Sequence, residues 1–495
     1  MARESVTPAS AGPVLDVTLR PERAGGPEVT AIDVRVEVRG VSSREGQTFS
    51  VRAPVVYASV TGIADRIQQL AVRDSAGSVP LTTQDDPVNR GGFPYYRHWR
   101  ADRAVTYPAV LTYRSLPQAT PPVTGPQFSF RAHDGGLSTA GSGFLALPEN
   151  TGSLAVHVRW DLSELAAGSI AASTLGEGDI DYIGAPDRLT QMYYMVGPIG
   201  RYAPTGTDRG FIAYWLGQPP FEPRKEMEWA SRSYAFQRAF HRDTSVTSYR
   251  MFLRAVPGAR AALGGTALQN SFMLGTIAGA GDSAVGPRET MAHEMGHMFI
   301  GAIPGTGGGP WFNEGLNVFY TRLLLLRSGL EPVSAYERSI NSTARAYYGS
   351  PFRNVPADSL DKLGFSVGVG AGSAQNVPYN RGSLYFASVD SKIRAASGGK
   401  RKLDDVILAL FERRRRGERF GVDALLEAFE KEYGSSARTD FESVVVRGET
   451  IVPASDAFGP CFERRSTKTT VQGRTVDGYE WVRVASVPDE QCRAW

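Results

Sequence analysis

Apolar and polar residues alternate with a period of two between Leu15 and Tyr202. The clearest alternating segments are LDVTLR, IDVRVEVRG, AVLTYRS, FSFRAH and LAVHVRWDL, and clusters of Gly, Pro, Asn and Asp separate them. Such alternation places apolar side chains on one face of a strand and polar side chains on the other. Short strands with frequent turns predict an antiparallel β-sandwich over residues 14–203.

The pattern changes near Pro204. FIAYWLG (Phe211–Gly217) and SYRMFLRAV (Ser248–Val256) have the composition of buried strands, whereas Pro223–Asp243 begins with proline at a suitable first position for a helix. Helical periodicity then dominates residues 331–455, as in KLDDVILALFERRRRGERF and VDALLEAFEKEYG. The sequence therefore predicts a multidomain α+β protein, with a mixed α/β domain at 204–330 and a C-terminal helical domain at 331–455.

The two ends of the chain differ in character. Residues 1–13 form a polar leader without the apolar stretch of an intact signal peptide. Residues 456–495 form a tail that contains both cysteines, Cys461 and Cys492, outside any CxxC pattern. Free buried thiols and a disulfide are both compatible with this spacing. We favour the disulfide, which implies a periplasmic or secreted protein, while a cytoplasmic location stays open.

Composition narrows the classes of partner. The chain has 495 residues, 42% of them hydrophobic, and a formal net charge of +3, which is typical of a globular protein with several domains. Basic residues are spread along the chain, so no nucleic-acid partner is expected. No apolar run approaches the roughly 20 residues that cross a bilayer, so no integral membrane segment is expected either. The oligomeric state leaves no signature in the sequence.

The segment RETMAHEMGHMFIGAIPGTGGGPWFNEG carries the chemistry. His293 and His297 stand four residues apart, so a helix places both on one face and aims their ring nitrogens at one point. Two such imidazoles form half of a tetrahedral zinc shell. Glu294 then lies beside the metal, where it can accept a proton from an attacking water. We expect the helix to continue to Ile300, with Gly296 permitting a close approach to a sheet or substrate.

The third ligand follows from elimination. No histidine comes after His297, and Ile303 occupies the position of the third histidine of a metzincin. The first carboxylate downstream is Glu314, in GPWFNEGLNVFY. Two histidines and a glutamate with one open position are the catalytic zinc pattern, and this donor set makes Zn²⁺ the expected cofactor. The alternative for Glu314 is an acid that is stabilised by a helix N-terminus.

HEMGH followed by WFNEG resembles the gluzincin zinc metallopeptidases and is most similar to their glycyl aminopeptidase family. DGGLSTAGSGFLALP, VRWDLSELAAGS, YYMVGP, PYNRGSLYF and FESVVVRGETIVP resemble further segments of that family, so the resemblance spans residues 14–455. It implies a thermolysin-like catalytic domain at 204–330 and peptide or protein substrates. Members often carry a C-terminal PDZ domain, for which about forty remaining residues are too few.

The resemblance implies a catalytic role for Tyr379 in the PYNRG segment of the helical domain. In related enzymes the equivalent tyrosine donates a hydrogen bond to the oxyanion that forms during hydrolysis, and such a donor contributes several kcal/mol in a dry site. This chain departs from the family pattern at Arg381, where relatives have lysine.

The resemblance also implies a substrate-binding segment in GGTALQNS, which occupies the place of the GAMEN segment of related aminopeptidases. Gly264, Gly265, Gln269 and Asn270 are the residues expected to contact substrate. Gln269 stands where relatives have a glutamate that binds the free amino terminus. An amide accepts a hydrogen bond from an ammonium group without neutralising it, so altered recognition of the peptide end is expected.

Asn313 and Asn317 flank Glu314, whereas relatives often have a carboxylate at the position of Val318. Both asparagines are candidates to support the metal ligands by hydrogen bonds. The predicted function is a zinc-dependent peptidase, with altered recognition of the amino terminus if it is an aminopeptidase. The alternatives are a peptide-binding protein with a weak or inactive zinc site, and an esterase or epoxide hydrolase that uses the same site.

Overall fold

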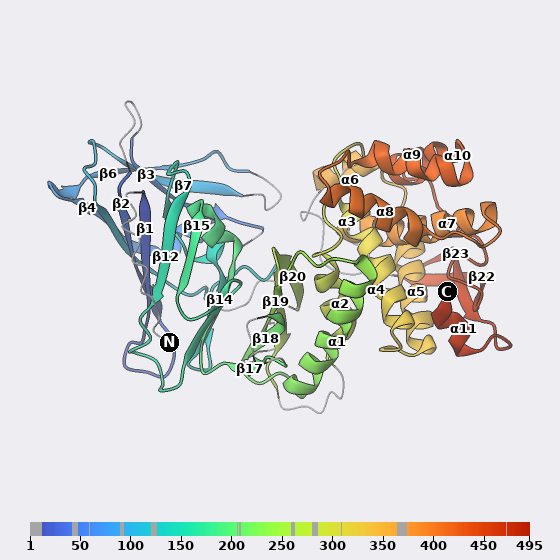
Figure 1. Ribbon diagram of the computed structural model, residues 1–495, viewed down its shortest axis with the longest axis horizontal. Helices are drawn as coiled ribbons and strands as arrows, with labels where there is room; N and C mark the ends of the chain where they lie inside the picture. Colours follow the sequence, from blue (N-terminus) through green and yellow to red (C-terminus); the bar gives the residue numbers. More distant parts are fainter. Residues whose placement is uncertain are drawn as a thin grey trace, which may run out of the picture. The chain divides into compact units, whose positions relative to one another are not determined.

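The computed structural model describes residues 12–41, 48–58, 60–89, 94–119, 126–204, 206, 209–258, 263–279, 286–307, 309–363, 374–471 and 473–495. The chain forms two compact units (Figure 1). Unit 1 comprises Met1–Met227 and Val246–Gly286, and unit 2 comprises Glu228–Ser245 and Pro287–Trp495. Most of the expected leader, residues 1–13, lies outside the described residues. Within the described ranges, no helix has the length and apolar character to cross a membrane.

Unit 1 is built from β-strands, which form four sheets among the described residues. The first sheet contains, in spatial order, β15 (Ile180–Gly184), β12 (Leu154–Trp160), β1 (Val14–Glu22), β2 (Ala31–Arg39), β8 (Ala109–Ser115), β4 (Ile67–Asp74) and β5 (Gly77–Val79). The second contains β11 (Leu147–Pro148), β3 (Ser50–Val56), β7 (Tyr95–Ala101) and β6 (Leu81–Asp85). The third contains β14 (Gly176–Glu177), β13 (Ile170–Ser173), β16 (Tyr193–Gly197), β10 (Gly136–Ala140) and β9 (Arg131–His133).

The first sheet corrects the expectation of a purely antiparallel sandwich. β1 pairs with β2 in antiparallel register, with Val17 opposite Val36, but it pairs in parallel with β12, where Val17 stands opposite Val158. Strands that follow one another closely form antiparallel pairs through short turns, whereas a parallel pair needs a long connection. More than a hundred residues separate β1 from β12, so local alternation gave no information on their relative direction.

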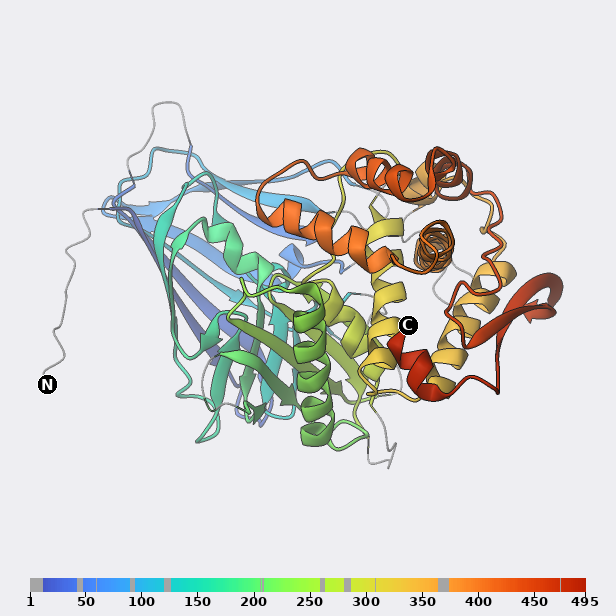
Figure 2. The same cartoon turned by 45° about the vertical axis from the view of Figure 1, so that its right-hand side comes forward.

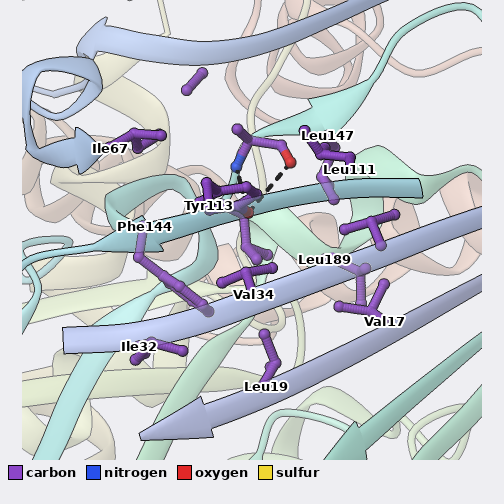
Figure 3. Packing of buried hydrophobic residues seen from close by; sticks show 14 of the residues in the cluster. Val17, Leu19, Ile32, Val34, Ile67, Leu111, Tyr113, Phe144, Leu147 and Leu189 are labelled. Atoms are coloured by element: carbon purple, nitrogen blue, oxygen red, sulfur yellow. Dashed lines mark hydrogen bonds between the residues drawn. The ribbon is translucent and has the colours of Figure 1, made fainter. Parts of the chain in front are cut away.

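The core of unit 1 follows the predicted alternation. β2 has the burial pattern of a strand with one covered face, and its buried residues pack with those of neighbouring strands in one apolar cluster. Figure 3 shows Leu19, Val34 and Tyr113 within this cluster. The hydroxyl of Tyr113 accepts a hydrogen bond from the amide of Ala146 at 2.8 Å and donates one to its carbonyl at 3.2 Å. The phenol thereby stays buried without an unpaired oxygen.

The fourth sheet of unit 1 is mixed. It contains, in spatial order, β17 (Gly200–Tyr202), β18 (Gly210–Leu216), β19 (Ser248–Val256), β21 (Ser271–Ile277) and β20 (Gly264–Leu268). β18, β19 and β21 run parallel, and β20 is an antiparallel edge strand. The strands expected at Phe211–Gly217 and Ser248–Val256 are confirmed as β18 and β19.

Unit 2 is mainly helical (Figure 1). Its helices are α1 (Pro223–His241, whose first residues belong to unit 1), α2 (Arg288–Gly296), α3 (Pro310–Asn313), α4 (Gly315–Arg327), α5 (Val333–Gly349), α6 (Ala357–Leu363), α7 (Val377–Ala396), α8 (Leu403–Arg415), α9 (Val422–Tyr433), α10 (Ser436–Phe441) and α11 (Asp489–Ala494). The helical patterns expected at 223–243, in KLDDVILALFERRRRGERF and in VDALLEAFEKEYG are confirmed as α1, α8 and α9. The chain is thus a mixed α/β protein with a helical C-terminal region.

Residues 456–495, expected as a tail, form a folded end to unit 2. β22 (Phe462–Val471) and β23 (Arg474–Arg483) make a hairpin, which is red in Figure 2, and α11 follows it. Asn341 of α5 binds the backbone of Trp481 through two hydrogen bonds of 2.8 Å. A disulfide joins Cys461 to Cys492. The hairpin and the disulfide therefore fix this segment on the helices.

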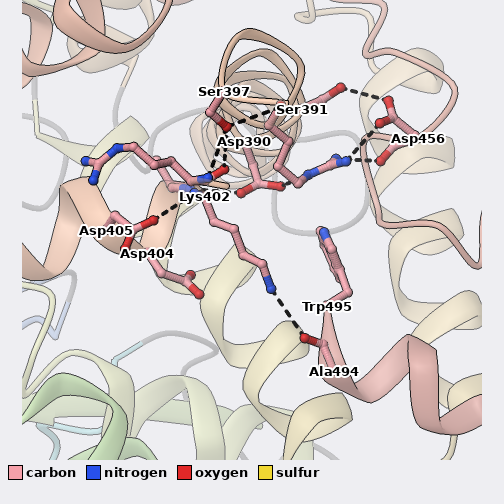
Figure 4. Close-up of polar contacts among 12 residues, drawn as sticks. Asp390, Ser391, Ser397, Lys402, Asp404, Asp405, Asp456, Ala494 and Trp495 are labelled. Carbon is pink, nitrogen blue, oxygen red and sulfur yellow. Dashed lines mark hydrogen bonds and ion pairs between the residues drawn. The ribbon is translucent and has the colours of Figure 1, made fainter. Parts of the chain in front are cut away.

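A polar cluster ties α7 to α8 and to the chain before the hairpin (Figure 4). Buried Asp390 of α7 accepts hydrogen bonds from Nε of Arg394 at 2.8 Å and from the amide of Leu403 at 2.9 Å. Arg394 and Ser391 both bind Asp456, each at 2.8 Å. The charged groups are paired, as burial requires.

Candidate metal centre

Three side chains of unit 2 converge on one point. Nε2 of His293 lies 3.1 Å from Oε2 of Glu314 and 3.2 Å from Nε2 of His297, and Nε2 of His297 lies 3.3 Å from the same carboxylate oxygen. One ligand atom from each residue lies within 4.8 Å of the other two. In the part of the chain that the structure describes, these three form the one group with the geometry to hold a metal ion.

The histidines owe their convergence to α2. His293 lies in its last turn, and His297 is the residue directly after it, with φ −59° and ψ −22°. His297 therefore keeps helical geometry, and the four-residue spacing brings both rings to one face. The expected continuation to Ile300 is wrong: the amide of Met298 bonds to the carbonyl of Met295 at 3.2 Å, and α2 ends at Gly296 in a tighter turn.

Glu314 occupies the junction between α3 and α4. It ends α3 and precedes the first residue of α4, and its carbonyl accepts the amide of Val318 at 2.8 Å. Trp311 and Phe312 of α3 are buried and anchor the short helix. The junction thus holds the carboxylate beside the two imidazoles.

Asn317 links α4 to α2. Its side chain is fully buried, and its Nδ2 donates to the carbonyl of His293 at 2.8 Å. Gly296 makes room for it, because a Cβ on Gly296 would collide with the Asn317 amide, whose Cγ would be only 3.0 Å away. The close approach expected at Gly296 is therefore to a side chain of the neighbouring helix, and not to a sheet or substrate.

A pair of glycines brings α7 against α4. A Cβ on Gly315 would lie 2.5 Å from Cα of Gly382, and a Cβ on Gly382 would collide with the carbonyl oxygen of Trp311. Gly315 follows Glu314 directly, and Gly382 lies one turn after Tyr379. The contact between two bare backbones therefore sets the distance between the carboxylate ligand and the tyrosine helix.

Tyr379 lies next to the three ligands. Its ring is stacked near that of His293, with centroids 6.1 Å apart. Burial and the negative charges of Glu314 and Glu294 raise the pKa of Tyr379 above its usual range. The phenol hydrogen is thus available for donation beside the candidate metal site.

Glu294 lies close enough to the same site for its charge to affect His297 and Tyr379. Its side chain is 7% exposed, and its negative charge acts on both His297 and Tyr379. Burial alone would lower the pKa of His297, but Glu314 and Glu294 raise it above the usual value. The two carboxylates therefore give the site a negative charge, which favours the binding of a divalent cation.

Burial would raise the pKa of the Glu314 carboxyl, but hydrogen bonds from His293 and His297 hold it far below its usual range. Glu314 is therefore ionised at neutral pH. An ionised carboxylate and two imidazole Nε2 atoms are the donors that Zn²⁺ prefers, and three protein ligands leave a position open for chemistry. The residues present fit this ion.

The departure at Arg381 has a structural explanation. Its guanidinium is buried and donates to the carbonyls of Arg353 at 2.7 Å and of Val355 at 2.8 Å. It holds α7 to the loop between α5 and α6. The substitution at this position therefore serves packing of the helix that carries Tyr379.

The structure tests the predicted role of Asn313 but does not test the predicted substrate contacts of the segment GGTALQNS. Within the described residues, Oδ1 of Asn313 is buried without a hydrogen-bond partner, and Asn313 makes no hydrogen bond to a metal ligand. Gly264 and Gly265 lie on β20, and Gln269 and Asn270 form the turn into β21. These four residues belong to unit 1, and their contact with substrate stays a prediction.

Sequence reasoning missed two supports of the site. Gln237 of α1 is buried and donates from Nε2 to the carbonyl of Ala292 at 3.0 Å, next to the first histidine. A glutamine in an amphipathic helix gives no sequence signal of such a contact. The glycine pair Gly315 and Gly382 did leave a signal, because each glycine interrupts an otherwise helical segment.

No family model and no curated protein matches this sequence. Solved structures match the fold. An aminopeptidase N family protein from Idiomarina loihiensis has 13% identity and a TM-score of 0.70, over 92% of this chain and 79% of that one. An M1 zinc metallopeptidase from Deinococcus radiodurans has 16% identity and a TM-score of 0.47, over 89% of this chain and 96% of that one.

Native leukotriene A4 hydrolase from Saccharomyces cerevisiae has 13% identity and a TM-score of 0.48, over 89% of this chain and 68% of that one. At such low sequence identities the similarity shows the fold alone. The conclusion about the fold rests on the aminopeptidase N family structure, with its TM-score of 0.70. The chain therefore shares its fold with an aminopeptidase N family protein.

Proposed function

We propose that this protein is a zinc-dependent peptidase. The convergence of His293, His297 and Glu314, with Glu294 and Tyr379 beside them, carries the proposal. The fold shared with an aminopeptidase N family protein supports it, as does the match between this donor set and catalytic zinc sites. The proposal includes a thermolysin-like catalytic domain over residues 204–330.

The three ligands would hold Zn²⁺ through two Nε2 atoms and one carboxylate oxygen. When bound, Zn²⁺ would acidify a water molecule and polarise the peptide carbonyl. Glu294 accepts the proton of the attacking water on its carboxylate and delivers it to the nitrogen of the leaving amine. Tyr379 donates its hydroxyl hydrogen to the oxygen on which negative charge develops.

The proposed substrates are peptides or proteins, and Gln269 sets how their amino terminus is recognised. A neutral amide supplies one hydrogen bond to an ammonium group, but a carboxylate would add a charge-assisted bond of about twice the strength. Peptides with a blocked amino terminus should therefore be cleaved at a rate close to that of free peptides. Cleavage of free peptides alone would contradict this role of Gln269.

A defined peptide library tests the proposal. The zinc-loaded protein is incubated with paired free and N-acetylated peptides, and the products are sequenced by mass spectrometry. Ladders from the amino terminus indicate an aminopeptidase, and internal cleavage indicates an endopeptidase. His293→Ala, which removes one ligand, is the control for contaminating peptidases and should cleave nothing.

The same experiment separates the alternatives. Binding of peptides without any product would support a peptide-binding protein with an inactive site and would refute the peptidase. Hydrolysis of ester or epoxide substrates, with peptides left intact, would assign the site to other hydrolytic chemistry. Intact Glu294 and Tyr379, and the packing role of Arg381, favour turnover over binding alone.

We also propose that the protein works in an oxidising compartment, in the periplasm or outside the cell. The disulfide between Cys461 and Cys492 supports this location, because such bonds are rare in the reducing cytosol. Both cysteines are buried in the folded protein, so alkylation of thiols in cells lysed directly into denaturant tests it. Both cysteines should resist labelling until a reductant is added, and immediate labelling would contradict the proposal.

A further inference from the structure

Unit 1 buries a group of arginines that is separate from the candidate metal ligands of unit 2. Arg131 on β9 is 4% exposed, and Arg254 on β19 is 1% exposed. Arginine is almost never fully buried unless an anionic group pairs with it. An unpaired buried charge is strongly destabilising, so it matters which groups bind these two guanidinium groups.

Neutral atoms satisfy the donors of Arg254. Nε and Nη2 donate to Oε1 of Gln127 at 3.0 and 2.7 Å, and Nη1 donates to the carbonyl of Ser129 at 2.8 Å. Nη2 also donates to Oγ of Ser129 at 3.2 Å. Burial, with the charge of Arg131, lowers the pKa of Arg254 to about 9. The group therefore stays positive at neutral pH, and no acceptor cancels its charge.

Arg131 lies beside Arg254 and keeps part of its fork unpaired. Its Nε donates to the same Oγ of Ser129 at 3.1 Å, which brings the two guanidinium groups to one hydroxyl. Nη1 and Nη2 of Arg131 are buried and have no hydrogen-bond partner. These two nitrogen atoms form the face of the guanidinium that binds anions in a two-pronged contact.

A third arginine adds to the same positive region. Arg66 donates from Nη1 to the carbonyls of Thr61 and Gly62, both at 2.9 Å, but its Nε and Nη2 are buried without partners. Burial and the positive charge of Arg131 lower the pKa of Arg66 to about 10. Each of the two arginines thus has two unpaired nitrogens and lies in the field of the other.

The nearby carboxylates of Asp65 and Asp134 form ion pairs with other side chains. Asp65 pairs with Nη1 of Arg97 at 2.8 Å, and Asp134 pairs with Nδ1 of His133 at 2.9 Å. Nε2 of His133 is itself buried without a partner. Across the described ranges, no carboxylate forms an ion pair with Arg66, Arg131 or Arg254. Asp65 acts on Arg66 only at longer range, so the buried guanidinium groups keep spare donors that no carboxylate of the described residues binds.

We propose that Arg131 and Arg254 form an internal binding site for a small monovalent anion such as chloride, and that Arg66 adds positive charge to its surroundings. The anion would accept hydrogen bonds from Nη1 and Nη2 of Arg131 and would offset the charge of the neighbouring arginines. A monovalent ion is favoured over phosphate or sulfate, because the cost of moving an ion from water into a closed interior rises steeply with its charge.

The position of the site gives it a structural consequence. The amide of Gln127 donates to Oγ1 of Thr266 on β20 at 2.9 Å, and the hydroxyl of Tyr193 on β16 donates to the carbonyl of Thr266 at 2.9 Å. Arg131 belongs to the third sheet and Arg254 to the mixed sheet. The anion would therefore hold two sheets of unit 1 together, and Gln127 links Arg254 of this site to the edge strand β20.

Bromide replaces chloride in anion sites and scatters X-rays anomalously, so crystals of the full chain grown in sodium bromide test the site directly. The expected result is an anomalous peak in contact with Nη1 and Nη2 of Arg131. Water density at this position, with no anomalous signal, would overturn the proposal.

Solution measurements use matched arginine variants. The wild-type unfolding temperature, measured at constant ionic strength, should rise saturably when sodium chloride replaces sodium gluconate. Arg131→Met should abolish this response and, without chloride, unfold at or above the wild-type temperature. Arg250→Met removes another buried guanidinium of unit 1, bound to the Thr174 carbonyl and Ser248 Oγ, and should keep the response.

An Arg131→Met variant that responds to chloride as the wild type does would refute the site. A wild-type protein with no response beyond that of gluconate would refute it too. Both measurements read anion binding and stability and need no peptidase activity, so the anion site and the proposed function stand or fall separately.

Discussion

Because Gly296 contacts Asn317, we predict that Gly296→Ala destabilises α2 in the wild-type protein but stabilises it when Asn317 is replaced by alanine. Gly296→Ala adds a Cβ that collides with the Asn317 amide. The amide must then move, and it loses its 2.8 Å bond to the His293 carbonyl and its bond from Oγ1 of Thr321 at 3.3 Å. Each buried polar group left unpaired costs about 1–3 kcal/mol, and overpacking adds about 1–3 kcal/mol.

Alanine is favoured over glycine within a helix by about 1 kcal/mol. With one polar group left unpaired, Gly296→Ala should therefore destabilise α2 by roughly 1–5 kcal/mol in the wild-type background. In an Asn317→Ala background the collision is gone. The same Gly296→Ala change should then stabilise α2 by about 1 kcal/mol. The coupling between the two sites is therefore about 2–6 kcal/mol.

Hydrogen exchange of the amides of α2 measures this local stability in the full chain, without an assumption of two-state unfolding. Zinc affinity should fall about 10–100-fold in Gly296→Ala, since the carbonyl support of His293 is lost. Gly301→Ala is the matched control, because its Cβ would meet only Nη1 of Arg414 at 3.4 Å. Equal effects of Gly296→Ala in both backgrounds would refute the steric account.

Three further predictions address catalysis, pH and the disulfide. Tyr379→Phe should lower kcat about 100-fold with zinc content unchanged, because one oxyanion donor is lost; an unchanged kcat would remove Tyr379 from the mechanism. Burial, with the charge of Arg414, lowers the pKa of His241 to about 3, whereas the unfolded value is about 6.5. The unfolded chain thus binds more protons in this window, and stability should fall by up to about 4–5 kcal/mol as pH drops from about 6.5 towards 3. Thermal unfolding as a function of pH should show a smaller loss for His241→Phe, and parallel losses would contradict the assignment. Reduction of the disulfide between Cys461 and Cys492, which are separated by 31 positions, should cost about 4 kcal/mol on a chain-entropy argument. An unfolding temperature that is insensitive to reductant would exclude that contribution.

The parts of the site that the sequence predicted were governed by local rules. The four-residue spacing of His293 and His297 needs only helical geometry, and the absence of later histidines directed attention to Glu314. The structure brings these three side chains together. Period-two alternation likewise located β1 and β2, because burial of one sheet face depends on neighbouring positions alone.

The features that escaped prediction depend on contacts between distant segments. The parallel pairing of β1 with β12 joins strands that lie far apart in sequence. Asn317 of another helix packs against Gly296 at the end of α2 and binds the His293 carbonyl. Arg131 and Arg254 meet at the hydroxyl of Ser129 from two separate strands, and no spacing rule links them. Local sequence periodicity does not predict such contacts, because they arise from the tertiary packing of distant segments.

The role of Glu294 as the proton carrier is the central claim, and Glu294→Gln tests it most directly. The amide keeps the size of the side chain but cannot accept the proton of the attacking water, so peptide hydrolysis should fall about 100- to 10,000-fold. Glu289→Gln is the matched control on the same helix, where Glu289 is exposed and pairs with Arg322 at 2.8 Å. Zinc content and turnover are measured together on both variants.

The account predicts that Glu294→Gln binds a full equivalent of zinc and has lost turnover, while Glu289→Gln retains both zinc and turnover. Peptide hydrolysis at the wild-type rate by zinc-loaded Glu294→Gln would contradict the account.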